Sequence, residues 1–417
     1  MTIKSKSFWI SLSILDLCIG TFLAAILRSK TLFELPSIDY NLLLHVHSHF
    51  ALGWVTLALM VLMVNAFLTE EQKKLAIYQF IFWGIFACTW GLLLTFLFPG
   101  YPTLSTHISI LFIFFTYVFS WVFIRDIRKA TVSKTTQMLS IVSVVCLALS
   151  SAGTFSLSYL FAIQSLDGIL YRDALYSYLH LQYNGFFTLA VFALLFQKLE
   201  FILLQEAKKN IYHFSLLLVI SILPSMFLSY RWHDTSILFY VISVIGSILV
   251  MICFVWFITV LRSMLKVVKS VPPLLRFIGA LSIGSFMLKT FLQSFTIFSV
   301  IGNFVFGDRP IIMGFLHLVF LGFVALFLLF YVTQTGLLNI EKKVTKIALV
   351  VFAIGVVVNE ALLWSQGIPI VFIQSGDLIT WLLLGVSIWI FIGALLIGIA
   401  RIKSEPRLMK AIGNKKN

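Results

Sequence analysis

Twelve long runs of apolar residues, each near the length that crosses a bilayer, constrain this chain more than any other feature. A transmembrane helix needs roughly 20 consecutive apolar residues. The runs lack the alternation of apolar and polar residues that membrane β-strands show. The sequence therefore predicts an all-α, polytopic membrane bundle of about twelve transmembrane helices. We expect one domain over residues 1–417, with spans near 8–27, 41–68, 75–97, 104–124, 138–163, 177–197, 213–230, 236–261, 276–298, 310–334, 346–364 and 377–400.

Composition and charge support the same reading. Hydrophobic residues make up 60% of the chain and charged residues only 11%, which is far from the balance of a soluble domain. The net charge of +14 lies in short loops, so it indicates membrane topology and not nucleic-acid binding. Of the 30 lysines and arginines, 24 fall before the first span, after even-numbered spans or in the C-terminal tail. This bias predicts that both termini are cytoplasmic and that the protein is a multi-pass protein of the inner (cytoplasmic) membrane.

The positions of the histidines are the most informative local feature. The chain has eight histidines. Six of them are predicted roughly 5–12 Å below the outer end of their helix, and a seventh directly follows the outer end of a span. They are His45, His47, His49, His107, His180 and His317, followed by His233.

A layer of imidazoles at one depth is suited to a haem or metal site. Neutral imidazole is a good ligand for haem iron and for copper, and polar groups inside a membrane are costly and usually functional. His45 and His49 share one helix face, whereas His47 lies about 200° around the same helix. One helix can therefore serve two sites. The alternative for a single histidine near a helix end, such as His107 or His233, is an interfacial polar tip.

Four short segments carry a family resemblance. They are H-V-H-S-H-F-A-L-G-W from His45, H-L-Q-Y-N-G from His180, R-W-H-D from Arg231 and G-F-L-H-L from Gly314. Together with the helix count, they resemble the catalytic subunit of the haem–copper oxidase superfamily. That family has twelve helices with both termini inside, and its ligands come from helices 2, 6, 7 and 10 near the outer face.

The resemblance implies a haem-binding membrane redox protein that acts on or senses oxygen or nitric oxide. It implies an electron donor or a respiratory-complex subunit as partner, besides the lipid bilayer. No C-x-x-C-H motif is present, so the haem would be non-covalent. The H-x-H pattern lies on helix 2 here but on helix 10 in the family, and the copper histidines of helix 7 are reduced to one. The implied haem-binding residues are His45, His47, His49, His180 and His317, and the implied metal ligands, with or without copper, are His233 and His107.

Other polar residues in or beside the spans are candidate partners for protons or haem propionates. Intramembrane ionisable groups are functional candidates by default, although buried ion pairs or packing contacts are the alternative. Lys289 and Glu360 lie at similar depth, and the sequence does not show whether they face each other. The candidates are Asp16, Lys289, Glu360, Arg231 and Tyr183.

Two other functions stay open from the sequence. One is a transporter or channel with a histidine-lined polar site. Transporters commonly show paired helix interruptions, and Pro224 has no clear counterpart in another span. The other is a non-catalytic assembly factor of a respiratory complex.

Overall fold

The computed structural model describes residues 5–36, 38–97, 102–200, 202–307, 309–367 and 377–404. Within these residues, twelve helical stretches are long and apolar enough to cross a membrane, which confirms the predicted all-α bundle. The helices are α1 (Lys6–Ser29), α2 (Tyr40–Phe67), α3 (Glu70–Lys73), α4 (Ala76–Leu97), α5 (Pro102–Ile127), α6 (Lys134–Ala162), α7 (Gly168–His180), η1 (Leu181–Phe187), α8 (Thr188–Leu199), α9 (Gln205–Met226), η2 (Phe227–Tyr230), α10 (Ile237–Val268), α11 (Pro273–Phe295), α12 (Ser299–Gly307), α13 (Arg309–His317), η3 (Leu318–Ala325), α14 (Leu326–Gln334), α15 (Lys343–Gln366) and α17 (Leu378–Ser404).

Several spans begin at a residue that caps the free backbone amides of the first turn. Asp39 accepts from the amide of Leu42 at the start of α2. Asp167 accepts from two amides at the start of α7. Such caps satisfy donors that have no partner inside the helix. They therefore set where each span can begin after its loop.

Three spans form the centre of the bundle. They are α2, the continuous stretch α7–η1–α8 and the continuous stretch α13–η3–α14. In their most apolar windows, 78%, 83% and 78% of residues are buried, against at most 56% for any other span that the structure describes. The ring of Phe320 in η3 contacts Trp54 of α2 and both Tyr183 and Phe187 of η1. The histidines predicted for spans 2, 6 and 10 therefore lie on the three innermost spans.

Two of these central spans change helical form at a histidine. The α-helix α7 ends at His180 and continues as the π-helical segment η1. The α-helix α13 ends at His317 and continues as the π-helical segment η3. π-Helical turns are rare and are frequent at functional sites, since each one re-aims the side chains beside it. The two segments pack against each other.

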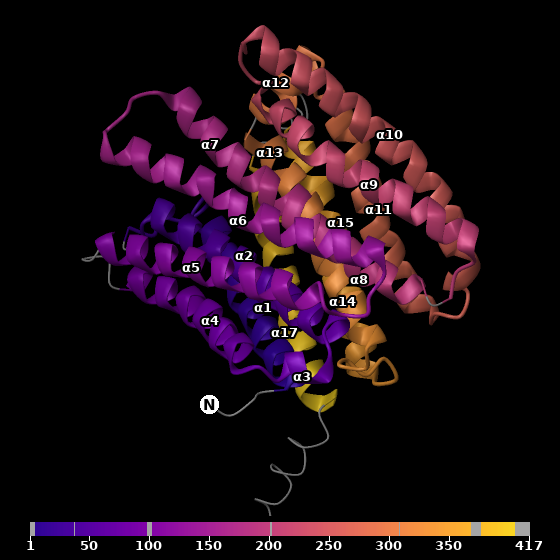
Figure 1. Cartoon of the computed structure of the whole chain (residues 1–417). Coiled ribbons are helices and arrows are strands. Elements are labelled where there is room, and N and C mark those ends of the chain that lie inside the picture. Colours follow the sequence, from indigo (N-terminus) through magenta and orange to yellow (C-terminus); the bar gives the residue numbers. More distant parts are fainter. Residues whose placement is uncertain are drawn as a thin grey trace, which may run out of the picture.

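The first and last spans, α1 and α17, pack side by side (Figure 1). The guanidinium of Arg401 near the end of α17 donates to Ser11 Oγ at 3.1 Å and to the carbonyl of Ser7 at 3.1 Å. The start of α1 and the end of α17 are thus at the same end of the molecule. That this end faces the cytoplasm stays a prediction from the charge bias.

Candidate functional site

The opposite end of the bundle, where α1 ends and α2 begins, holds the candidate site. We call it the histidine end. His45, His47 and His49 lie in the first turns of α2, and His180 and His317 lie on the other two central spans. The arrangement brings five of the predicted cofactor-binding residues into the same part of the bundle, but their ring nitrogens are engaged very differently.

His47 and His317 each have one ring nitrogen held by the backbone. Nδ1 of His47 lies 3.0 Å from the carbonyl oxygen of Gly20 on α1. Nδ1 of His317 lies 2.6 Å from the carbonyl oxygen of Met313, one turn earlier on α13. A carbonyl oxygen only accepts, so both Nδ1 atoms carry the proton and donate it. The Nε2 atoms keep their lone pairs, and neither is hydrogen-bonded to another described residue.

The same end is positively charged. His317 lies within electrostatic range of His47 and of the Arg28 guanidinium at the end of α1. Arg28 in turn lies within range of Arg309, whose Nη2 donates to the hydroxyl of Tyr40 at 2.9 Å. Among the described residues, no carboxylate forms an ion pair with Arg28 or Arg309. Two guanidinium groups are therefore available to an anionic group near the two imidazoles.

His49 lies on a different side of α2 from His47. Its ring packs edge-on against Phe112 of α5, with ring centroids 4.9 Å apart. The Nε2 atom of His49 is buried and has no hydrogen-bond partner. His45 lies within electrostatic range of His49 and is exposed. One helix thus directs imidazoles toward α1 and toward α5.

His180 is buried, and both of its ring nitrogens are engaged. Nε2 lies 2.9 Å from the carbonyl oxygen of Ile222 and therefore donates to it. Nδ1 lies 3.1 Å from the amide nitrogen of Asn184 and therefore accepts from it. The other end of the Asn184 amide, Oδ1, accepts from Nζ of Lys289 on α11. This chain of bonds leaves no lone pair on His180 for a metal.

Two cavities adjoin this hydrogen-bonded chain. The first leaves about 570 Å³ unfilled by atoms, including any part open to solvent, and its lining includes His180, Tyr183 and Phe306. The second leaves about 320 Å³ and is lined in part by Lys289 and Cys253. Three residues line both cavities, namely Asn184, Ser225 and Gln293.

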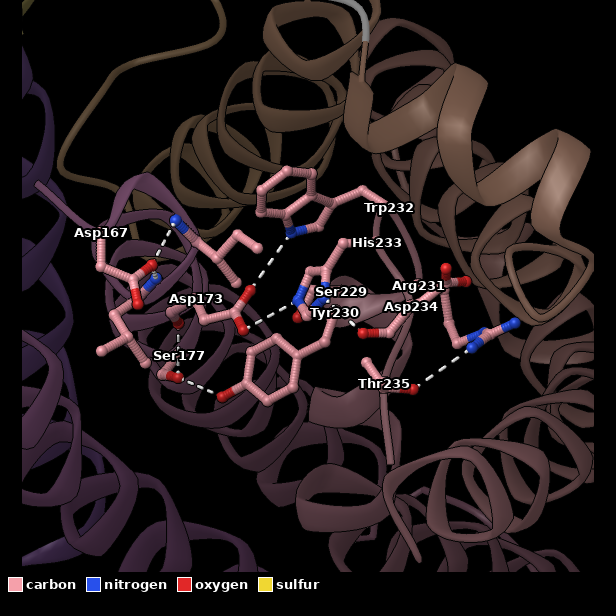
Figure 2. Close-up of polar contacts among 12 residues, drawn as sticks. Asp167, Asp173, Ser177, Ser229, Tyr230, Arg231, Trp232, His233, Asp234 and Thr235 are labelled. Carbon is pink, nitrogen blue, oxygen red and sulfur yellow. Dashed lines mark hydrogen bonds and ion pairs between the residues drawn. The ribbon is translucent and has the colours of Figure 1, made fainter. Parts of the chain in front are cut away.

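His233 sits in the loop after η2 and is held in an ion pair, as Figure 2 shows. Its Nε2 lies 3.0 Å from Oδ2 of Asp173 on α7, and its Nδ1 lies 2.9 Å from the carbonyl oxygen of Asp234. Both partners are acceptors, so each ring nitrogen faces a protein oxygen. Oδ1 of the same Asp173 accepts from the indole of Trp232 at 3.1 Å. Neither ring nitrogen is free for a metal.

The remaining predicted residues are scattered. Asp16 is buried on α1, and its Oδ1 accepts from Trp90 at 2.8 Å while Oδ2 has no partner. Glu360 on α15 contacts its neighbour Asn359 and does not pair with Lys289. Arg231 lies over the ring of Tyr240 and donates to Thr235. His107 is exposed in the first turns of α5.

The donor geometry does not assemble a copper site. Among the described residues, no three side chains of histidine, cysteine, aspartate or glutamate come together in a way that could hold a metal ion. His180, predicted to bind haem, and His233, predicted to bind a metal, both have their nitrogens bonded to protein groups. The imidazoles of His47 and His317 fit a haem ligand role, because each has a backbone-held Nδ1 and a free Nε2.

Some residues of the site were not singled out from the sequence. Arg28 was not among the predicted site residues, and it lies within electrostatic range of His317 and His47. Asp173, the partner of His233, was not among them either. Its position two turns before His180 on one polar helix was the only available signal. The Gly20 carbonyl gives no signal in sequence at all.

The described residues form an all-helical bundle with twelve candidate membrane spans, and this class of fold is that of a haem–copper oxidase subunit. In particular, the chain is similar in structure to a haem–copper terminal oxidase dimer solved by cryo-electron microscopy. The match has a TM-score of 0.63 and covers 96% of this chain and 83% of that one, at 14% sequence identity. No family model matches the sequence, and no curated protein matches it. The similarity concerns the fold.

Proposed function

We propose that this protein is a haem-binding redox protein of the inner membrane, in which the imidazoles of His47 and His317 would hold one non-covalent haem. The observation that carries the proposal is the matched state of the two rings. Each donates Nδ1–H to a backbone carbonyl at 3.0 and 2.6 Å and leaves Nε2 free. A ligating histidine is ordinarily held in this way, because the outer hydrogen bond fixes the tautomer and raises the basicity of the ligating nitrogen.

The surroundings of the pair support a macrocycle with two carboxylate groups. Arg28 and Arg309 have no carboxylate partner among the described residues, and guanidinium suits planar carboxylates. They would hold the propionates. Gly20, whose carbonyl holds His47, lies against the backbone of Ala51 on α2. This close approach lets α1 orient the ligand helix.

A haem with two imidazole ligands supplies one-electron transfer. The protein's own residues would supply the two imidazoles, and the carbonyls of Gly20 and Met313 orient the two rings. We therefore favour electron transfer, with an electron-donor protein or a respiratory-complex subunit as the partner.

Copper does not form part of the proposal. His180 and His233 have no nitrogen lone pair to offer, because each ring is fully bonded to protein groups. No step of oxygen reduction at a haem–copper pair is derived for this chain.

A pyridine-haem spectrum combined with metal analysis tests the proposal. Protein purified in mild detergent from haem-replete cells should contain about one haem iron per chain and no stoichiometric copper. Protein with no Soret band and no iron would contradict it. Stoichiometric copper would contradict the reading of His180 and His233.

A further inference from the structure

We propose that the buried ammonium of Lys289 is the centre of a binding site for a small inorganic monoanion such as chloride or nitrite. Lys289 lies on α11, a helix without acidic residues, and is 6% exposed. Among the described residues, no carboxylate pairs with it. An isolated charge inside a bilayer is costly unless a counter-charge or a cluster of polar groups compensates it.

The hydrogen bonds around Lys289 run in one direction. Nζ donates to Oδ1 of Asn184. The Asn184 amide nitrogen then donates to His180, and His180 donates to the carbonyl of Ile222. An ammonium has three donors, and only this one is used within the described residues. Two N–H groups therefore remain to be satisfied by a group that accepts.

Gln293 gives a second, independent indication of a ligand. It lies one turn after Lys289 on α11 and is 4% exposed, and it lines both cavities. Its side-chain amide has no hydrogen-bond partner among the described residues. A buried polar group without a partner is uncommon in native structures, and each one calls for a bound water, ion or ligand.

The residues that line the second cavity favour an anion as the ligand. Among the residues that line this cavity with Lys289, Gln293 offers an amide donor and none is a carboxylate, while the Ser225 hydroxyl donates to the Ile222 carbonyl. A cation with neutral donors favours an anion over a metal ion. The second cavity has a volume of about 20 Å³ on the measure by which one water molecule needs about 10–15 Å³. It has room for a small ion that has lost most of its water.

The linewidth of the ³⁵Cl nuclear resonance, measured during a chloride titration, tests the site. The full chain is used in nanodiscs, and nitrite serves as competitor. We expect a saturable excess linewidth that nitrite displaces. Lys289→Met should weaken chloride binding at least tenfold, and Lys289→Arg should retain most of it. Lys198→Met, which removes a lysine packed over the Tyr331 ring, is the matched control and should change nothing.

Three results would overturn the proposal. They are an absence of saturable broadening in the unaltered chain, equal affinity in Lys289→Met, and equal loss in Lys198→Met. If Lys289→Met does not purify as a monodisperse protein, Gln293→Leu replaces it, with an expected several-fold weakening. His317→Ala is titrated in parallel. Retained chloride binding there separates this site from the haem site, so the two proposals can fail independently.

Discussion

Two pairs of histidines at the histidine end show how hydrogen bonding decides what an imidazole can do. On the side of α1, α2 and α13, His47 and His317 use one nitrogen each and keep the other free. On the side of α7 and η2, His180 and His233 use both. Residue type and depth are alike in the two regions. The two regions differ in whether the second ring nitrogen is hydrogen-bonded to a protein group. Only the rings whose second nitrogen is free can bind a metal.

The largest expected effect lies on the first side. His47→Ala and His317→Ala should each reduce bound haem at least tenfold, because each substitution removes one axial ligand. His213→Ala, on a ring that packs against Trp256 of α10, is the control and should keep haem at the level of the unaltered chain. Haem per chain is measured from the pyridine-haem spectrum. Equal haem content in all three variants would show that neither His47 nor His317 binds haem.

The next effect is on stability and lies on the second side. His180→Ala should leave haem content unchanged and lower the free energy of unfolding by about 3 kcal/mol, since it opens a cavity and leaves the Asn184 amide without its acceptor. Thermal unfolding in detergent, followed by circular dichroism, measures the change. Loss of haem with no loss of stability would place His180 among the ligands instead.

A further substitution tests the close contact of η1 with α6. A Cβ atom at Gly185 would lie 2.5 Å from Cβ of Cys146, closer than real atoms approach. Gly185→Ala should therefore destabilise the bundle by about 1–3 kcal/mol through overpacking. Gly284→Ala, at a glycine with open space around it, is the control. Equal unfolding midpoints in the two variants would contradict the packing described for the π-helical segment.

The smallest effect is expected at the surface. His233→Ala removes an ion pair whose two side chains are 17% and 20% exposed, so we expect a loss of no more than about 1 kcal/mol. Asp173→Asn and the double variant complete a thermodynamic cycle that isolates the pair. Haem and metal content should not change. A loss of bound metal in His233→Ala would contradict the conclusion that protein groups occupy both nitrogens of this ring.

The fold was largely predictable because lipid imposes a minimum length on each apolar run. All twelve spans follow from that length. The prediction put the start of the seventh span near residue 213, whereas α9 begins at Gln205. Polar residues such as Lys208 and Lys209 lengthen the helix beyond its apolar part. The π-helical segments η1 and η3 were not predicted, because tertiary packing and not composition selects them.

The sequence predicted that these histidines lie near one end of their helices, but it did not predict most of the groups that their side chains contact. The placement of His47 and His49 on different sides of α2 follows from helical periodicity, which the sequence carries. The partner of Lys289 was not predictable, because depth alone also allowed a pair with Glu360. In the structure, Lys289 donates to Asn184 instead. The acceptor of His317 is local, one turn earlier at Met313. The acceptor of His47 comes from another span and could not be read from the chain.

Near-infrared magnetic circular dichroism of the oxidised protein tests the central claim most directly, because its charge-transfer band depends on the two axial ligands of a low-spin haem. We expect the band of paired neutral imidazoles, lost in both His47→Ala and His317→Ala. A band typical of another ligand pair, or one unchanged in both variants, would contradict the assignment of His47 and His317 as the ligands.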